Sequence, residues 1–360
     1  SRQIWEEFNI SKPQKENPDF ILVDQHHKID KDLWDYKTKL RSVINIKSQM
    51  NIKSYNTMNN KYELVNTLKK LNDKRLDKML LEQHHINLYN IFKRKVNINK
   101  YQNLFDSQKV WIFKFIYGHS GINIIVLDNF NNFKKFVKKI INQNFSKWEN
   151  VNYNEYLKFN KKKKYNYLFE WVLQEYVHNP ALYENKKFHI RGYYLFHNNI
   201  NKKEGFIFNN GRIAVANKEY SKGDYKNKDI HDTHFYRIPS EKKIFIKPHI
   251  YGLISVMKIK QFEKDLKYLF NKITKINKVK CYSNDESCYN LYGFDIMLTS
   301  DYKIKLIECN RAPGLLSYNE DIKTIDHPYH IFDSILECIV DRKFKLEKSI
   351  KKTNNFIQVF

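Results

Sequence analysis

The sequence predicts a fold that mixes helices and strands, of the α/β or α+β class. Segments of alternating or continuous apolar residues, typical of strands, are interleaved along the chain with segments whose apolar residues recur at helical spacing. Hydrophobic residues make up 42% of the chain and aromatic residues 15%. This is enough for a sizeable core and excludes a disordered, collagen-like or coiled-coil chain. With 360 residues, two or three domains that share one active site are expected.

The first half of the chain predicts, in order, a helix, two strands, a helix and a strand. Helical spacing of apolar residues marks residues 61–81, and residues 109–126 indicate two short strands joined by a loop at 117–121. Asp128 can cap the helix that follows. The apolar positions of that helix recur at a helical period and are Phe130, Phe133, Phe136, Val137, Ile140 and Ile141. A nearly continuous apolar segment, 168–177, predicts a buried strand.

The next part of the chain favours strands. Residues 187–196 alternate between polar and apolar side chains, as a strand does. Residues 205–216 predict a hairpin, because the pair Asn210-Gly211 at their centre is a strong turn signal. An amphipathic helix is predicted over 262–276.

The last part of the chain predicts a second hairpin over residues 292–309, which turns near Ser300-Asp301. A helix is expected at 330–344, and the polar residues that follow, 346–360, are expected to form a loosely held tail.

The chain is strongly basic, with 64 Lys and Arg against 39 Asp and Glu and a net charge of +25. Such a charge attracts an anion: nucleic acid, nucleotide phosphates, an acidic membrane or an acidic protein tail. Charge alone does not choose among these. Part of it also follows from the heavy use of Lys, Asn, Ile, Tyr and Phe that AT-rich coding produces. No recognition helix, RNA-binding signature or zinc finger is present in the sequence, so nucleic acid is the weaker expectation.

Cysteine use and hydropathy indicate a cytoplasmic protein with no membrane segment. The chain has four cysteines at irregular positions, too few for a disulfide framework, which favours a reducing compartment. No apolar run approaches the ~18 residues that a spanning helix needs. The first residues, SRQIWEEFN, lack a basic segment followed by an apolar one, so no secretory signal is expected.

The predicted hairpin at 292–309 carries the strongest chemical signal. If it turns symmetrically about Ser300-Asp301, paired residue numbers sum to about 601, and Asp295 and Glu308 are diagonal neighbours on one face with Asn310. Two carboxylates and an amide oxygen are a ligand set suited to Mg²⁺. The alternative is an ordinary hairpin with a solvent face. Against it, both carboxylates interrupt apolar strands, where an unpaired charge is unfavourable.

The opposite side chains of that hairpin, Ile296, Leu298, Ile307 and Cys309, are expected to pack.

A lysine before a glycine loop is the second signal. Lys114 interrupts an apolar strand, and the glycines Gly118 and Gly121 follow shortly after it. A lysine that projects from a strand beside such a loop can hold phosphates while the loop covers them. The segment does not match a Walker P-loop, and a snorkelling lysine before a plain turn is the alternative.

The third signal is a cationic strand. Lys187, His189 and Arg191 occupy alternate positions, so their side chains share one face. A cationic face opposite a carboxylate face could enclose a triphosphate. An exposed sheet face in a basic protein is the competing interpretation, and for this segment taken alone it is the favoured one.

In combination, these segments resemble the tubulin–tyrosine ligase-like family of ATP-grasp amino-acid ligases. The resemblance extends over about residues 59–315 and rests on motifs in the family's order. They are a W-I-x-K strand with a glycine loop, a Q-[KE]-Y hinge, a K-F-x-I-R strand, G-F-D, and I-E-x-N followed by proline. In this chain they are Trp111–Lys114, Gln174–Tyr176, Lys187–Arg191, Gly293–Asp295 and Ile307–Asn310 with Pro313; Lys61 matches an upstream lysine of the family.

The resemblance implies an α+β, ATP-grasp fold in which two lobes hold Mg·ATP between their sheets. A small α/β domain at 1–58 would precede a central lobe at 59–177, and a C-terminal lobe with the metal site would cover 178–345.

The resemblance also assigns roles, residue by residue. ATP would be bound by two lysines, a hinge, a glycine loop and a histidine: Lys114, Lys187, Gln174, Glu175, Tyr176, Val177, Gly118, His119, Gly121, Ile122 and His189. Mg²⁺ would be bound by Asp295, Glu308 and Asn310. Arg191 would face the γ-phosphate, Lys61 would help to seat the substrate, and Glu308 would count among the catalytic residues.

By the same resemblance, the reaction would activate a carboxylate as an acyl phosphate and transfer it to an amine. The expected co-substrate is a free amino acid, and the expected partner is an acidic protein or peptide tail, with tubulin as one candidate. No membrane partner is expected.

Two departures from the family pattern bear on activity. His189 stands where the family usually has Asp, and Ala214 or Val215 falls where it has an Arg, with Arg212 and Lys218 as the nearest substitutes. A histidine cannot reproduce the acceptor role of a carboxylate. The alternative to a ligase is therefore an ATP-binding pseudoenzyme that serves as an interaction module. A nucleic-acid binder is a third hypothesis and rests on charge only.

Overall fold

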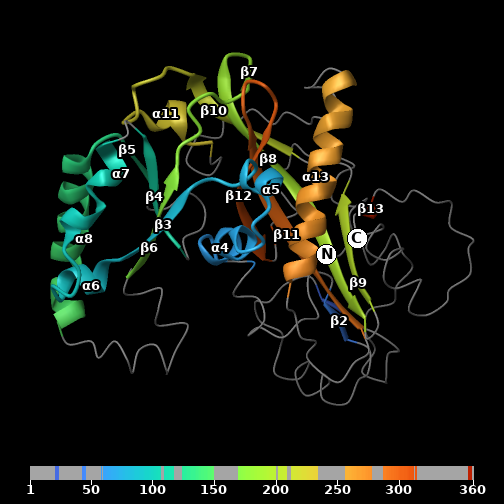
Figure 1. Ribbon diagram of the computed structural model, residues 1–360, viewed down its shortest axis with the longest axis horizontal. Coiled ribbons are helices and arrows are strands. Elements are labelled where there is room, and N and C mark those ends of the chain that lie inside the picture. Colours follow the sequence, from blue (N-terminus) through green and yellow to red (C-terminus); the bar gives the residue numbers. More distant parts are fainter. Residues whose placement is uncertain are drawn as a thin grey trace, which may run out of the picture.

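The computed structural model describes residues 58, 60–106, 109–116, 124–149, 169–199, 202–208, 212–233, 256–277, 287–311 and 313, of which 199, 202, 212, 256–259, 287–288 and 311 are described by their backbone alone, as are 21–23, 43–45 and 356–358. In the predicted N-terminal domain, the described residues form one parallel pair, β1 (Ile21–Val23) and β2 (Val43–Asn45). The rest builds two antiparallel sheets with helices beside them (Figure 1). This confirms the α+β class.

The smaller sheet has four strands in the order β3-β6-β4-β5. Their bounds are β3 (Gln83–Asn87), β4 (Trp111–Phe115), β5 (Ile124–Leu127) and β6 (Glu170–Glu175). The 20-residue helix α8 (Phe130–Glu149) covers the face turned away from the larger sheet (Figure 1). Short helices complete this part of the chain: α6 (Leu88–Phe92), the 3₁₀ helix η2 (Ile98–Tyr101) and α7 (Asn103–Asp106).

Side chains alternate along β4 and β6, so successive residues point to opposite faces of the smaller sheet. Trp111, Phe113 and Trp171 point into an aromatic core with α8, where Phe113 stacks on Trp171 with ring centroids 4.6 Å apart. Residues of opposite parity, Lys114 and Gln174, point to the other face. Asn129, rather than the predicted Asp128, caps α8 by accepting from the amide of Asn132, while Asp128 accepts from side-chain amides.

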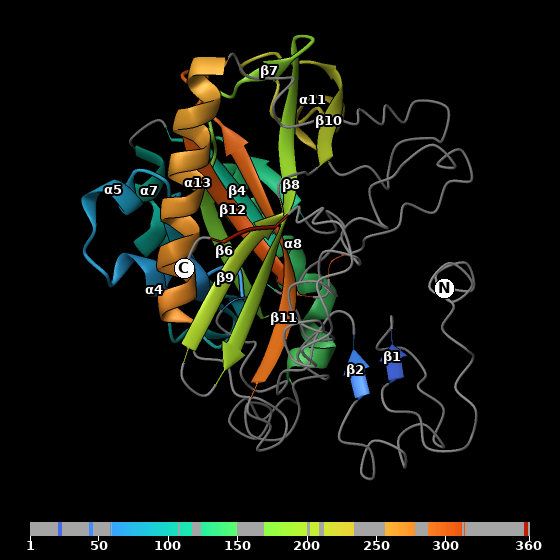
Figure 2. The same ribbon diagram turned by 90° about the vertical axis from the view of Figure 1, so that its right-hand side faces the viewer.

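The larger sheet has seven strands, with the path β12-β11-β8-β9-β13 and two further strands on β8. Their bounds are β7 (Leu182–Tyr183), β8 (Lys186–Asn199), β9 (Lys202–Phe208), β10 (Arg212–Glu219), β11 (Ser287–Leu298), β12 (Ile304–Arg311) and β13 (Phe356–Gln358). The helix α13 (Val256–Ile276) lies along one face of this sheet (Figure 2). The structure therefore confirms the amphipathic helix and the strand predicted at 187–196.

Two short helices, α4 (Glu63–Lys69) and α5 (Lys74–Asp77), replace the single helix predicted over 61–81. The helix breaks because Asn72 adopts a left-handed backbone with φ 50° and Asp73 starts a new helix as its N-cap. Both helices pack into the core of the larger sheet with α13, although their sequence position placed them with the central lobe. The domain boundaries themselves stay a prediction.

The hairpin predicted over 205–216 is wrong. β9 and β10 do not pair with each other; both pair antiparallel with β8, on the edge opposite β11. They follow one another along the 14 residues of β8, and the chain reverses between β8 and β9 instead. The long edge of β8 provides pairing for both segments, so this tertiary contact outweighs the local turn signal of Asn210-Gly211.

The hairpin of β11 and β12 is confirmed, but its predicted register is wrong. Ile296 pairs with Leu306, and Asp295 pairs with Glu308, so a β-bulge leaves Ile307 without a partner. The extra residue places Leu306 in the core with Ile296, Leu298 and Cys309. Ile307 instead packs with Met297 on the other face, contrary to the expectation that it joins that core.

Other predictions fall outside the described residues, among them the loop with Gly118, His119, Gly121 and Ile122 and the helix at 330–344. In the segment predicted as a loose tail, Phe356–Gln358 adds the strand β13 to β9. Across the described chain, no helix is long and apolar enough to cross a membrane.

Candidate nucleotide-binding site between the two sheets

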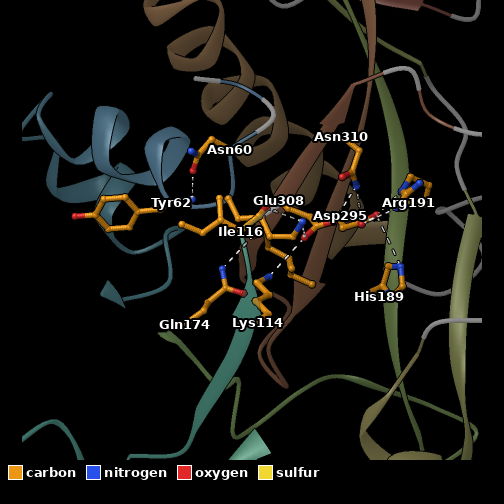
Figure 3. Close-up of polar contacts among 12 residues, drawn as sticks. Asn60, Tyr62, Lys114, Ile116, Gln174, His189, Arg191, Asp295, Glu308 and Asn310 are labelled. Carbon is orange, nitrogen blue, oxygen red and sulfur yellow. Dashed lines mark hydrogen bonds and ion pairs between the residues drawn. The ribbon is translucent and has the colours of Figure 1, made fainter. Parts of the chain in front are cut away.

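A cavity of about 270 Å³ lies between the two sheets. The smaller sheet contributes Lys114 and neighbouring apolar side chains of β4 and β5, and the larger sheet contributes Lys187, His189, Asp295 and Glu308. The cavity therefore brings together residues from segments more than 190 positions apart. Figure 3 shows Lys114 approaching Glu308 while His189 and Arg191 approach Asp295 from β8.

The two predicted metal-binding carboxylates lie side by side because the bulge sets Asp295 directly opposite Glu308. The amide of Asn310 contacts both: its Nδ2 lies 3.3 Å from Asp295 Oδ2 and 2.9 Å from Glu308 Oε1. The predicted trio thus shares one face, as expected. Across the described part of the chain, no group of three or more His, Cys, Asp and Glu side chains could hold a metal ion.

Glu308 is paired with two lysines. Its Oε2 lies 3.6 Å from Lys61 Nζ and 3.5 Å from Lys114 Nζ, and Lys61 also donates to the carbonyl of Ile116 at 3.3 Å. Lys114 is buried, with 3% of its surface exposed. Burial lowers the pKa of Lys114 to about 8, against the opposing effect of the Glu308 charge.

Asp295 is bound by Arg191 through two hydrogen bonds, from Nε to Oδ1 and from Nη2 to Oδ2, the latter 2.7 Å long. Burial opposes ionisation of Asp295, but the charge and hydrogen bonds of Arg191 hold its pKa below the usual value. His189 lies on the same strand face, with Nε2 3.8 Å from Asp295 Oδ1 and Nδ1 2.6 Å from the hydroxyl of Thr233.

Gly293, two residues before Asp295, lies where the fold leaves no room for a side chain. A Cβ atom there would lie 2.8 Å from Cβ of Pro313 and 3.3 Å from Cδ of Arg191. Only glycine therefore leaves room for both the proline that follows Asn310 and the arginine that holds Asp295.

Lys187 is a second buried ammonium, and in the described part of the chain no carboxylate lies within 4.0 Å of it. Its Nζ lies 4.0 Å from the ring centroid of Tyr176, a cation–π contact. Burial lowers its pKa to about 7, with a smaller opposing effect from Asp232. A buried lysine without an ion pair is the kind of group that an anionic ligand stabilises in its charged form.

The predicted hinge lies at the end of β6, and its residues do not line the cavity. Gln174 is fully buried; its Nε2 donates to the carbonyl of Ile307 at 3.1 Å, whereas its Oε1 has no partner. The amides of Glu175 and Tyr176 donate to backbone carbonyls of Glu82 and Val110. Val177 packs beside Met297. Lys61, Arg191 and Asn310 likewise do not line the cavity, but they contact Asp295 or Glu308.

Sequence reasoning missed one wall of the cavity. It is formed by residues of the segment 225–233, which includes the short helix α11 (Lys228–His231). Lys226 and Lys228 are its cations, while the suggested substitute Lys218 is exposed and pairs with Asp229 at 3.7 Å. Asn227 is the N-cap of α11, and an asparagine is a residue type that can indicate the start of a helix in the sequence. Only the fold shows that this helix reaches the cavity.

Known proteins share both the fold and the sequence pattern. Over 100% of this chain and 94% of the other, the structure superposes with a TM-score of 0.63 and 17% identity on the C-terminal domain of K. lactis Pby1, described as an ATP-grasp enzyme interacting with the mRNA decapping enzyme Dcp2. The two sheets with a cavity between them are therefore an ATP-grasp fold. The model of the tubulin-tyrosine ligase family matches residues 39–243 and 256–347, and the chain belongs to this family.

Curated relatives match about half of the chain. The probable tubulin polyglutamylase TTLL9 of Mus musculus is 23% identical over 52% of this chain and 42% of its own length. The probable tubulin–tyrosine ligase PBY1 of Saccharomyces cerevisiae is 24% identical over 56% and 29%. Tubulin glycylase 3F of Tetrahymena thermophila is 27% identical over 51% and 22%. The matched region spans less than half the length of each of these relatives.

Proposed function

We propose that this chain is an ATP- and Mg²⁺-dependent ligase that adds an amino acid to a carboxylate of an acidic protein or peptide. The observation that carries the proposal is the cavity between the sheets, which is lined by two buried lysines from different sheets, the buried Asp295 and the partly buried Glu308. Family membership and the ATP-grasp fold support a nucleotide as the ligand. Phosphate oxygens would be held by Lys114 from one lobe and Lys187 from the other.

The residues present fit a magnesium ion. The side-chain amide of Asn310 lies within hydrogen-bond distance of both carboxylates, Asp295 and Glu308. The amide now directs its nitrogen to both carboxylates, and turned over it would offer its oxygen, so all three groups could supply the hard oxygen ligands that Mg²⁺ prefers. When bound, the ion would neutralise phosphate charge that develops during transfer.

The proposed reaction has two steps, and the chain's own part in both is positioning and charge neutralisation. First, a carboxylate oxygen attacks the γ-phosphorus, the bond to the ADP oxygen breaks, and an acyl phosphate forms. Second, the amine attacks the acyl carbon, phosphate leaves with its bonding electron pair, and the nitrogen loses a proton. We assign Arg191 to the transferred phosphoryl group and Lys61 to the substrate carboxylate, because both already bind carboxylates in this structure.

An acidic acceptor matches the charge of the chain. A net charge of +25 attracts a chain segment rich in Glu or Asp and speeds its association. A free amino acid would supply the amine.

The test is to incubate the protein with Mg·ATP, the twenty amino acids and glutamate-rich peptides, and to follow peptide mass and ADP release. Addition of one or more amino acid residues with matching ADP release is expected. Arg191→Gln, which keeps a polar side chain but removes the charge, should abolish addition. Binding of ATP without any addition to proteins or peptides would contradict the ligase.

That negative outcome would favour the second candidate, an ATP-binding pseudoenzyme that acts as an interaction module. The observation behind it is His189, which stands at the family's Asp position and contacts Thr233 and Asp295 instead of leaving a free carboxylate there. Restored addition in His189→Asp would identify this substitution as the cause.

A further inference from the structure

We propose that His231 is a positioning residue that fastens one wall of the cavity, residues 225–233, to the end of β6 through Tyr176. The inference rests on the proposed function only in taking a nucleotide as the ligand of the cavity. The fastening itself is independent of ligand identity.

Two hydrogen bonds hold the His231 ring. Its Nδ1 lies 2.8 Å from the hydroxyl of Tyr176, and its Nε2 lies 2.8 Å from the carbonyl oxygen of Asp224. A carbonyl can only accept, so Nε2 carries the hydrogen and, in the neutral ring, Nδ1 accepts from the Tyr176 hydroxyl. Burial and then the nearby Lys187 charge lower the pKa of His231, which favours this neutral form.

Aromatic packing keeps the ring in place. His231 makes edge contacts with the rings of Tyr176 and Tyr220 and a tilted contact with Tyr225. Tyr220 is itself tied to β6's end, since its hydroxyl donates to the carbonyl of His178 at 2.9 Å. The ring is therefore enclosed by three tyrosines and cannot turn without breaking both hydrogen bonds.

The wall that His231 holds carries groups that face the ligand space. Lys226, Lys228 and Thr233 line the cavity beside it, and Thr233 also binds His189 on the larger sheet. In the described part of the chain, α11 contacts β10 and β8, whereas the His231 hydrogen bond links it to Tyr176, the residue that directly follows β6. Without that hydrogen bond, the wall would keep the ring contact of Tyr225 with Tyr176 but lose its polar link to the end of β6.

Tyr176 joins this wall to the phosphate-binding lysine. Its hydroxyl hydrogen-bonds to His231, and the Nζ of Lys187 lies 4.0 Å from the centroid of its ring. One side chain therefore sets both the position of the wall and the environment of Lys187. Loss of the hydroxyl should weaken nucleotide binding although the hydroxyl itself is directed at His231 and not at the ligand.

The experiment measures ATP affinity by calorimetry in wild type, Tyr176→Phe, His231→Phe, His231→Asn and the double variant Tyr176→Phe/His231→Phe. Tyr176→Phe should weaken binding about five- to tenfold, the effect of one hydrogen bond. The double variant should bind no more weakly than His231→Phe. His231→Asn should recover part of the affinity, because its amide oxygen can accept from Tyr176.

Tyr194→Phe is the matched control. Tyr194 is a buried tyrosine on β8 whose hydroxyl lies 2.7 Å from the hydroxyl of Thr274, in the core between the larger sheet and α13. It should lose stability and keep its ATP affinity, which separates positioning from a general loss of stability.

Hydrogen exchange of the ligand-free proteins distinguishes failure of this inference from failure of the proposed function. Amides of residues 224–233 should exchange faster in Tyr176→Phe and His231→Phe than in wild type. If that holds but wild type binds no ATP, the nucleotide assignment fails and the fastening stands. Wild-type ATP affinity in both variants, additive losses in the double variant, or unchanged exchange would overturn the inference.

Discussion

Lys187 is a residue whose protonation should affect ligand binding, beside Lys114 with its pKa of about 8. Its pKa of about 7 results from burial, so at pH 8 most of the free protein has a neutral Lys187. Bound phosphate would raise this pKa, because an opposite charge favours the ammonium. ATP binding at pH 8 should therefore take up a proton, and affinity should fall as pH rises from 6.5 to 9. Calorimetry in buffers of different ionisation enthalpy measures the uptake.

The control for this prediction is Lys187→Arg, which stays charged over the whole range. The proton uptake assigned to Lys187 should vanish in that variant. An uptake that is the same in wild type and Lys187→Arg would show that another group titrates.

Glu308 should weaken the binding of ATP in the absence of Mg²⁺. Because its carboxylate pairs with Lys61 and Lys114, ATP must displace these pairs unless Mg²⁺ takes the carboxylate in exchange. In Glu308→Gln the lysines are released, so we expect ATP without Mg²⁺ to bind more tightly, by about tenfold, and Mg²⁺ to give no further gain. Titrations with EDTA or excess Mg²⁺ check this; weaker metal-free binding in the variant would contradict it. Asp301→Asn, which alters an exposed pair with Lys303, is the control.

At the scale of elements, the junction of α4 and α5 ties this pair of short helices to α13. Asp73 begins α5 by accepting from the amides of Arg75 and Leu76, and it also binds Lys272 of α13 at 2.7 Å. Asp73→Ala should lower the free energy of unfolding by about 1–2 kcal/mol, as loss of an N-cap does. Urea unfolding measures the change. Asp73→Asn preserves the cap and should lose clearly less; equal losses would assign the effect to the ion pair.

The β-bulge in β12 is the element that arranges the carboxylates. One unpaired residue, Ile307, changes a diagonal relation between Asp295 and Glu308 into a direct one. It also presents the carbonyl of Ile307 to Gln174 of the smaller sheet. The pattern of polar and apolar residues predicted which side chains share the face of Asp295. It could not predict the bulge, because a bulge of this kind leaves no composition signal.

At the scale of the whole molecule, the contacts that connect the two sheets at the site include Gln174 with Ile307, Lys114 with Glu308, and Lys61 with both Glu308 and Ile116. A ligand that binds both lobes should add to this connection. Mg·ATP at 100 times its dissociation constant should raise the free energy of unfolding by about 2.7 kcal/mol. At that ATP concentration, thermal melting should show the shift in wild type and lose most of it in both Lys114→Ala and Lys187→Ala. If the shift survives in Lys114→Ala, binding needs only the lobe of Lys187. If it survives in Lys187→Ala, binding needs only the lobe of Lys114.

The sequence by itself determined the class of fold, the strands that carry the site and the chemistry of each face. Lys187, His189 and Arg191 share a face because a strand alternates, and Asp295, Glu308 and Asn310 share one for the same reason. Motif order was enough to indicate the family. These features depend on local periodicity and residue type, which are readable in any single chain.

Only the tertiary structure decided which groups meet. It paired Arg191 with Asp295 and both Lys61 and Lys114 with Glu308, brought 225–233 to the cavity, and extended β8 with β9 and β10 one after the other. The physical reason is that such contacts join residues far apart in the chain. Their geometry depends on bulges, packing and the long edge of β8, and local sequence patterns do not encode these.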